Sequence, residues 1–267
     1  MISTKRAQAG RGHAPDAGLD RAAFLRPIAH RGWHDKAKGR VENTASAFRA
    51  AIDKGYGIEC DLQAAADGTP MVFHDEKLDR LMDAAGPIAA YTPRSLSRFR
   101  YKDLDERILT FSQLLDLVRG RVPLLVEVKR NGRPLQPNFL ESIARIAGAY
   151  TGPVGLMSFD RDVVTELGKL APAIPRGPVI GGHQLLANLW ASRKRTRESP
   201  AASRLFGSVL DGIAFYAVDV KLAAVARTWM SRHALDLPLF TWTVRTPRQR
   251  AAAARWADAP IFEGYEP

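Results

Sequence analysis

Short apolar runs that end in polar residues alternate along this chain with segments of helical periodicity. Such βα alternation is typical of an α/β fold, in which helices cover a mainly parallel sheet. The clearest helix is predicted from Thr44 to Lys54, with Asn43 or Thr44 as its N-cap and Gly55 as its stop. The predicted strands are residues 27–29, 57–61, 71–74, 124–128, 154–158, 179–180, 213–215, 239–243 and 261–262.

Two connections are irregular. Residues 62–70 contain Asp67-Gly68 and are too short for a helical crossover, so they predict either a hairpin or an excursion at the mouth of a barrel. Nine strands are predicted, whereas a barrel of this class has eight, so one predicted strand must lie outside the barrel. The segment 75–122 is longer than one helix requires and is rich in Arg, Asp and Pro. We interpret it as an insertion that covers one barrel end.

The composition is that of a globular protein. A chain of 267 residues with 46% hydrophobic content can bury a full core, which excludes disorder for most of it. The single cysteine, Cys60, excludes a disulfide framework and any cysteine-rich zinc or iron–sulfur site. Residues 1–26 contain no apolar run, so we expect neither a signal peptide nor a membrane span. We therefore predict a cytoplasmic protein with a flexible N-terminal extension over residues 1–22.

The net charge of +11 is concentrated locally. Residues 176–204 contain six basic residues and one acid, and the densest part is 193–197. This stretch indicates a solvated basic loop, or a surface that attracts an anionic membrane or anionic substrates. Neither interleaved aromatic residues nor a nucleic-acid motif accompanies it, so we expect no nucleic-acid partner.

Acidic residues follow the apolar positions of two predicted strands. Because side chains alternate along a strand, Glu59 and Asp61 point to the same face and Cys60 to the opposite one. Glu127 and Lys129 repeat this spacing on another strand, and active sites of barrels lie at the C-terminal strand ends. Either motif alone fits a surface ion pair. Packed side by side, however, three carboxylates require a cation, and oxygen donors favour Mg²⁺ or Ca²⁺ over zinc.

Two histidines end predicted strands. His30 ends the first and is followed by Arg31, and His74 ends the third. Each alone is more often a structural histidine. Together they place two groups that titrate near neutrality beside the acids, which general acid–base cleavage of a phosphodiester requires. Arg31 and Lys129 add positive charge for the phosphate oxygens of the transition state.

A longer ordered set of motifs surrounds these residues. Its segments are residues 29–32, 42–44, 47–48, 55–62, 67–68 and 72–75, followed by 127–129, 158–159 and 242–244. In order, spacing and identity the set resembles the glycerophosphodiester phosphodiesterase family over most of residues 27–267. Two places depart from the family pattern. Val41 stands where the family usually has proline, and Phe262-Glu263 stands where it usually has a pair such as Thr-Asp.

The resemblance implies a single TIM-like (β/α)8 barrel over residues 23–267, irregular around its second and third strands. It also implies hydrolysis of glycerophosphodiesters to sn-glycerol 3-phosphate and an alcohol, with one divalent cation, Mg²⁺ or Ca²⁺. The implied site residues are, for the metal, Glu59, Asp61 and Glu127; for acid and base, His30 and His74; for phosphate and the pocket wall, Arg31, Lys129 and Trp242. Glu42 is a lesser candidate that would contact the metal or orient Arg31.

Two alternative functions stay open on the residues alone. A phospholipase D-like or lysophospholipid-cleaving enzyme on the same barrel would need an apolar entrance. An inactive barrel that acts as a binding module would have lost site residues, whereas all of them are present. The residues also leave open which histidine is the base, and whether water or the glycerol hydroxyl of the substrate attacks first.

Overall fold

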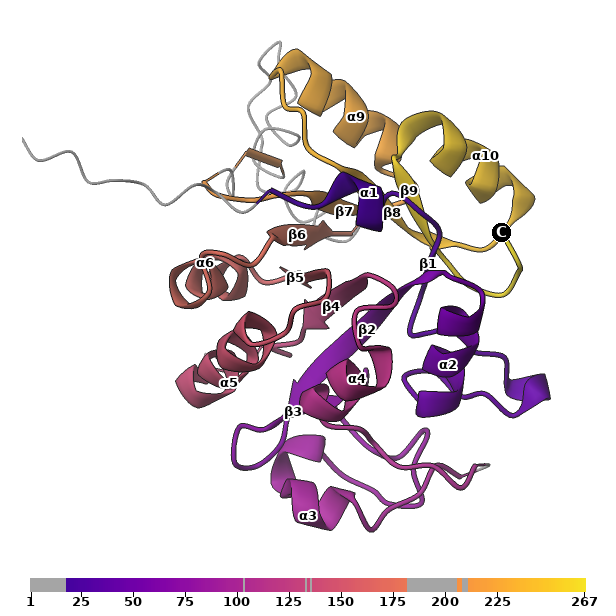
Figure 1. Ribbon diagram of the computed structural model, residues 1–267, viewed down its shortest axis with the longest axis vertical. Coiled ribbons are helices and arrows are strands. Elements are labelled where there is room, and N and C mark those ends of the chain that lie inside the picture. Colours follow the sequence, from indigo (N-terminus) through magenta and orange to yellow (C-terminus); the bar gives the residue numbers. More distant parts are fainter. Residues whose placement is uncertain (1–17, 103, 133, 135, 182–205, 208–210) are drawn as a thin grey trace, which may run out of the picture.

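The computed structural model describes residues 18–267, except 103, 133, 135, 182–205 and 208–210. Its barrel strands are β1 (Ile28–Ala29), β2 (Gly57–Ala64), β4 (Leu124–Val128), β5 (Val154–Ser158), β6 (Arg176–Ile180), β7 (Tyr216–Asp219), β8 (Leu239–Val244) and β9 (Ala259–Phe262). These eight strands pair in parallel in chain order, and β1 closes the ring by pairing with both β2 and β9. The chain is therefore an α/β TIM-like barrel, as predicted (Figure 1).

The surplus strand is β3 (Pro70–Val72), which pairs antiparallel with β2 and lies outside the barrel. The hairpin between them turns at Asp67-Gly68. The Asp67 carboxylate accepts a hydrogen bond from the Thr69 N–H at 2.9 Å, and Gly68 adopts φ +83°. A hairpin is therefore the correct reading of this short link, because glycine takes that left-handed conformation without steric cost.

The helices form the outer layer. They are α2 (Ala45–Asp53), α4 (Phe111–Val118), α5 (Pro137–Gly148), α6 (Arg161–Leu170), α9 (Ala223–Arg232) and α10 (Pro247–Trp256), which surround the strands in Figure 1. The predicted helix is α2, capped by Thr44 and stopped at Lys54 by Gly55 at φ +70°. The sixth barrel strand, β7, begins at Tyr216, directly after the predicted strand 213–215, because the apolar run 213–218 contains no boundary signal.

Strand alternation divides the core into two layers. Outward-facing residues such as Ile58, Cys60 and Val126 pack with the helices, whereas inward-facing residues such as Leu125 and Phe240 fill the barrel. The odd positions of β2 thus point inward. This is the face that carries the predicted acids.

A short helix, α1 (Arg21–Phe24), precedes β1 and packs on the inner layer. The Phe24 and Phe240 ring centroids are 6.4 Å apart, and Leu19 is 8% exposed in the same cluster. Residues 1–17 of the predicted extension lie outside the described residues. The last part of the predicted extension 1–22 thus packs on the barrel, because Leu19 is apolar and buried in the inner layer.

The predicted insertion contains η2 (Ile88–Ala90), α3 (Pro93–Leu96) and, at its end, α4. Because α4 packs against α2 and α5, it belongs to the helix layer. The excursion itself is therefore residues 75–110, with a small core of its own that includes Leu78, Met82 and Leu96.

No helix among the described residues is long and apolar enough to cross a membrane. The basic stretch 193–197 lies outside the described residues.

The close approach of β6 to β7 gives a test of the barrel packing. A Cβ on Gly177 would lie 2.3 Å from the Phe215 carbonyl oxygen, so Gly177→Ala should lower the free energy of unfolding by about 1–3 kcal/mol in urea denaturation. The control is Gly148→Ala at the end of α5, where no atom lies within 4 Å. It should stabilise by about 0.4–1 kcal/mol. Equal stabilities of Gly177→Ala and the unaltered chain would contradict the packing.

Candidate active site

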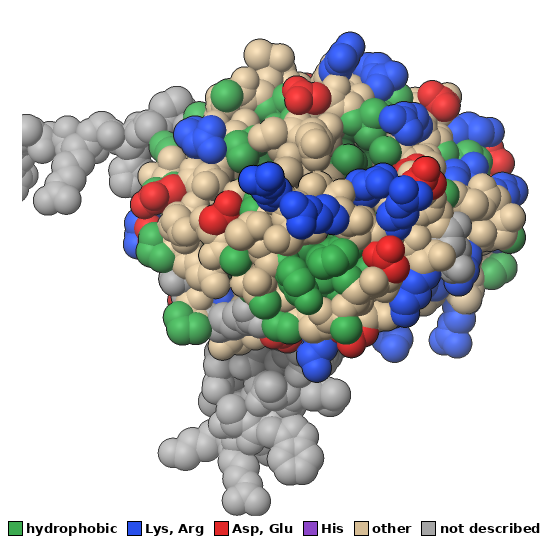
Figure 2. Space-filling model, turned by 90° about the horizontal axis from the view of Figure 1, so that it is seen from below, with side chains coloured by type: hydrophobic (Ala, Val, Ile, Leu, Met, Phe, Trp, Pro, Cys, Tyr) green, Lys and Arg blue, Asp and Glu red, His purple; other side chains and the backbone are tan. Residues whose placement is uncertain are grey.

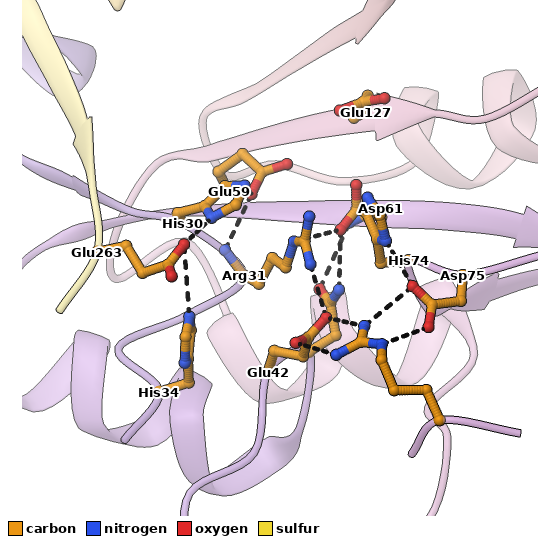
Figure 3. Close-up of polar contacts among 12 residues, drawn as sticks. His30, Arg31, His34, Glu42, Glu59, Asp61, His74, Asp75, Glu127 and Glu263 are labelled. Carbon is orange, nitrogen blue, oxygen red and sulfur yellow. Dashed lines mark hydrogen bonds and ion pairs between the residues drawn. The ribbon is translucent and has the colours of Figure 1, made fainter. Parts of the chain in front are cut away.

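A cavity of about 310 Å³ opens where the barrel strands end. Seven of the eight predicted site residues line it: His30, Arg31, Glu59, His74, Glu127, Lys129 and Trp242. The eighth, Asp61, contacts the same group through Arg31 and Lys129. The structure thus brings all eight together, and Figure 3 shows most of them converging on one region.

The three predicted metal ligands lie on adjacent strands. Asp61 on β2 pairs in register with Glu127 on β4. Glu59 lies two residues before Asp61 on β2, so its side chain points to the same face. The exposed fractions are 2% for Glu59, 1% for Asp61 and 7% for Glu127. One carboxylate oxygen from each residue lies within 4.8 Å of the others. Three carboxylates are therefore confined to one nearly solvent-free space.

Two cations contact these carboxylates. Lys129 Nζ lies 2.9 Å from Asp61 Oδ1 and 2.5 Å from Glu127 Oε1. Arg31 Nε lies 3.4 Å from Asp61 Oδ2, and the Arg31 main-chain N–H donates to Glu59 Oε2 at 2.9 Å. Three negative charges thus face two positive ones. Glu59 receives a main-chain hydrogen bond but no contact from the ammonium of Lys129.

The pKa values follow this distribution. Burial raises the pKa of Glu59 well above its ordinary value, and the charges of Asp61 and Glu127 raise it further. Burial would also raise the pKa of Asp61, but Lys129, His74 and Arg31 together outweigh it and the pKa falls. For Glu127 burial prevails over Lys129, so its pKa rises. The cluster as a whole therefore lacks positive charge.

The donor set fits a divalent cation. Three buried carboxylates supply only hard oxygen ligands, and a cation among them would replace the missing positive charge. Two other groups of possible ligands occur among the described residues, one around Glu263 and one around Glu42. The residues of both groups are only partly buried, whereas Glu59, Asp61 and Glu127 are all buried, where unbalanced charge costs more. The cluster of Glu59 is therefore the better candidate metal centre.

A tight turn after β1 aims Arg31 at the acids. Arg31 has φ +55° and Gly32 φ +78°, and a Cβ on Gly32 would lie 2.9 Å from the Phe48 ring. Glu42 accepts a hydrogen bond from Arg31 Nη1 at 2.7 Å, so it orients Arg31, which is one of the two roles considered for it. Asn43 Nδ2 donates to Asp61 Oδ2 at 2.9 Å.

The two histidines are each held by a carboxylate. His30 Nδ1 lies 2.7 Å from Glu263 Oε2, and Arg245 Nη2 lies 2.9 Å from the same oxygen. His74 Nδ1 lies 2.7 Å from Asp75 Oδ1. Burial lowers the pKa of each histidine, although these carboxylates oppose the change. Both imidazoles are therefore neutral near neutral pH, with Nδ1–H donating and Nε2 available.

Sequence reasoning missed Glu263, which contacts His30, and Arg245, which contacts Glu263. It also missed Arg80, which pairs with both Glu42 and Asp75. Glu263 lies 233 residues after His30 and becomes its neighbour only through the β1–β9 pairing. One signal was available, because Glu263 directly follows the predicted strand 261–262 and strand ends carry site residues in barrels. We had interpreted Phe262-Glu263 only as a departure from the family pattern.

Aromatic rings form one wall of the cavity. Trp242 and Phe159 meet edge to face with ring centroids 5.3 Å apart, and Lys129 Nζ lies 5.9 Å from the Phe159 ring centroid. The predicted position of Trp242 in the wall is therefore what the structure shows.

Comparison with known proteins points to one family. The sequence profile of the glycerophosphoryl diester phosphodiesterase family matches residues 30–262. A glycerophosphodiester phosphodiesterase of Caldanaerobacter subterraneus is 31% identical over 160 residues, which cover 56% of this chain and 64% of that protein. Mouse glycerophosphodiester phosphodiesterase 1 is 33% identical over 112 residues, 38% of this chain and 33% of the mouse protein. The aligned parts thus span less than two thirds of these relatives.

Solved structures share the fold. A phosphodiesterase of Oleispira antarctica, in complex with the product sn-glycerol-3-phosphate, superposes with a TM-score of 0.70 at 19% identity. The match covers 89% of this chain and 92% of that one. A glycerophosphodiester phosphodiesterase of Thermotoga maritima gives 0.66 at 21% identity, covering 90% and 94%.

The Glu263 contacts predict an acid-dependent stability. Burial would raise the pKa of Glu263, but His30 and Arg245 outweigh it and lower the pKa from 4.5 to about 2. A carboxyl whose pKa falls on folding stabilises the protein above its unfolded pKa, and the stabilisation is lost as pH falls toward the folded value. Glu263→Gln should therefore be less stable than the unaltered chain at neutral pH, with a difference that shrinks between pH 4.5 and about 2.

Urea denaturation across this pH window measures the effect. The control is Glu166→Gln, which removes an exposed ion pair with Lys169 on α6 and should change stability little. A difference between Glu263→Gln and the unaltered chain that stays constant with pH would show that His30 and Arg245 do not hold Glu263 as described.

Proposed function

The chain belongs to the glycerophosphoryl diester phosphodiesterase family, and we propose that it hydrolyses glycerophosphodiesters to sn-glycerol 3-phosphate and an alcohol. The observation that carries this proposal is the convergence of two carboxylate-held histidines and three buried carboxylates on one cavity. The proposed reaction would release sn-glycerol 3-phosphate, which is the product bound in the structure of the Oleispira antarctica phosphodiesterase.

Glu59, Asp61 and Glu127 would hold one divalent cation, Mg²⁺ or Ca²⁺. When bound, such an ion supplies positive charge for the phosphate oxygens of the substrate. The carboxylates also fix Lys129, whose pKa rises because Asp61 and Glu127 outweigh the effect of burial. Lys129 therefore stays protonated and presents its charge at the cavity.

Arg31 and Lys129 hold the phosphate. Both line the cavity, and Arg31 keeps its guanidinium in place through Glu42. Cations that are fixed in this way stabilise the charge that develops on phosphate oxygens during cleavage. Trp242 and Phe159 then provide an apolar wall for carbon atoms of the substrate.

His30 and His74 move the protons. Each displacement forms a phosphorus–oxygen bond to the attacking water or glycerol hydroxyl and breaks the one to the leaving oxygen. One base must therefore take a proton from the attacking group, and one acid must give a proton to the leaving alkoxide. Glu263 and Asp75 hold Nδ1 of the two rings, which leaves each Nε2 for this transfer. The ring that has taken a proton in one step can return it in the next.

A peripheral contact with an anionic membrane surface is part of this proposal only through the basic stretch 193–197, which would attract anionic lipid or substrate.

Comparing turnover of glycerophosphocholine with that of a lysophospholipid separates the proposed activity from the lysophospholipid alternative. Faster turnover of the lysophospholipid would favour that alternative.

The histidine roles predict the effect of single substitutions. His30→Ala and His74→Ala should each lower kcat for glycerophosphocholine by about 10²–10⁴-fold, because each removes a general acid or base. The measurement is release of sn-glycerol 3-phosphate in a coupled assay. His233→Ala, an exposed histidine after α9, is the matched control and should keep kcat close to that of the unaltered chain. If His30→Ala and His74→Ala behave like the control, the assignment is wrong.

The acidic cluster predicts stabilisation by divalent ions. Free Mg²⁺ or Ca²⁺ at about 100 times its Kd should add about 2.7 kcal/mol to the free energy of unfolding, seen as a rise in Tm. Glu59→Gln removes one ligand and should reduce the rise, whereas Glu141→Gln on the exposed side of α5 should retain it. An equal rise in Glu59→Gln would place the ion elsewhere.

A further inference from the structure

A second pocket lies beside the catalytic cavity and has a different character. Its volume is about 240 Å³. The polar residues that line it are His34, Lys36, Glu42, Arg80, Arg40 and Lys102. Pockets for drug-sized ligands begin at roughly 300 Å³, so this one suits a smaller molecule. Figure 2 views the molecule from the side of the excursion and shows Lys and Arg side chains gathered along the right of this face.

The cations of this pocket exceed its acids. Arg80 is paired, because Glu42 and Asp75 both accept its hydrogen bonds. Arg40 is paired only loosely. Its Nη2 lies 3.9 Å from Asp35, and its Nε is buried without a hydrogen-bond partner among the described residues.

Arg40 is nevertheless fixed in direction. Its guanidinium carbon lies 4.9 Å from the centroid of the Trp33 ring. Lys102 Nζ donates to the main-chain oxygen of Asp79, while the Asp79 carboxylate accepts from the Gly86 N–H. Because a main-chain oxygen is uncharged, this hydrogen bond does not neutralise the positive charge of Lys102. Two oriented cations with donors to spare therefore meet in one small pocket.

The pocket is separated from the catalytic cavity by one carboxylate. Glu42 accepts from Arg31, which lines the catalytic cavity, and from Arg80, which lines the pocket. In Figure 3 Glu42 lies on the other side of Arg31 from Glu59 and Glu127. A molecule in the pocket would therefore not contact the catalytic histidines.

We propose that this pocket is a second anion site, which binds a phosphate group through Arg40 and Lys102. Guanidinium and ammonium groups are the side chains that recognise phosphate, the first through paired N–H donors and the second as a point charge. The pocket size admits a phosphate or a small phosphomonoester. The site goes beyond the proposed hydrolysis, because neither Arg40 nor Lys102 has a role in the proposed cleavage.

Calorimetric titration with inorganic phosphate tests the site. Phosphate also has partners in the catalytic cavity, so the unaltered chain should show two binding steps. Arg40→Gln and Lys102→Gln should each weaken one step by about tenfold or more, because each removes a charge-assisted hydrogen bond. Lys129→Gln should weaken the other step and leave this one. Arg98→Gln, an exposed arginine on the excursion outside the pocket, is the matched control and should bind like the unaltered chain.

Two results would overturn the proposal. One is binding by both Arg40→Gln and Lys102→Gln that equals that of the unaltered chain. The other is loss of all phosphate binding in Lys129→Gln, since the catalytic cavity would then account for every bound ion. Lys102 is exposed, so Lys102→Gln reports on binding even where Arg40→Gln disturbs the packing on Trp33. The readout is binding rather than turnover, and it stands apart from the proposed activity.

Two further arms identify the source of the phosphate group. Sedimentation with phosphatidylcholine vesicles, with and without phosphatidic acid, detects a lipid headgroup, and titration with a soluble phosphomonoester detects a free ligand. Retention on the acidic vesicles that Lys102→Gln abolishes supports the site and assigns it to lipid. Binding of the soluble ligand alone supports the site and assigns it to a small molecule.

Discussion

The structure depends on how three buried carboxylates are kept together inside a barrel. Glu59, Asp61 and Glu127 point inward because strand alternation and the β2–β4 register leave them no other direction. Like charges in such a space repel strongly unless cations balance them. Lys129 and Arg31 supply part of the balance and are thereby placed where a phosphate group needs them. The same electrostatic requirement thus accounts for both the proposed metal site and the proposed phosphate site.

Barrel closure supplies the remaining parts. The pairing of β1 with β9 brings Glu263, at the end of the chain, to His30 at its beginning. The excursion after β3 brings Arg80 to Glu42 and Asp75. Each of the two histidines proposed to be catalytic is therefore oriented by a carboxylate that is itself held by an arginine, Arg245 for Glu263 and Arg80 for Asp75. Such support restricts the rings to one orientation, which proton transfer requires.

Much of this could be predicted from the sequence, because it rests on local rules. Alternation placed Glu59 and Asp61 on one face, and the short link with Asp67-Gly68 limited the connection to a hairpin, which the structure has, or an excursion at the barrel mouth. The contact between Glu263 and His30 could not be predicted, since it depends on closure between the two ends of the chain. The start of β7 at Tyr216 was missed for a different reason. Its apolar run carries no boundary, so only the tertiary register selects the strand.

We propose that the cluster of Glu59, Asp61 and Glu127 binds the divalent ion of a phosphodiesterase. Anomalous diffraction from crystals soaked with Mn²⁺ and sn-glycerol 3-phosphate tests this assignment. We expect one peak within about 2.0–2.6 Å of carboxylate oxygens of these three residues, beside the ligand phosphate. A peak at His30, His34 and Glu263 instead, or at Glu42, His74 and Asp75, would contradict it.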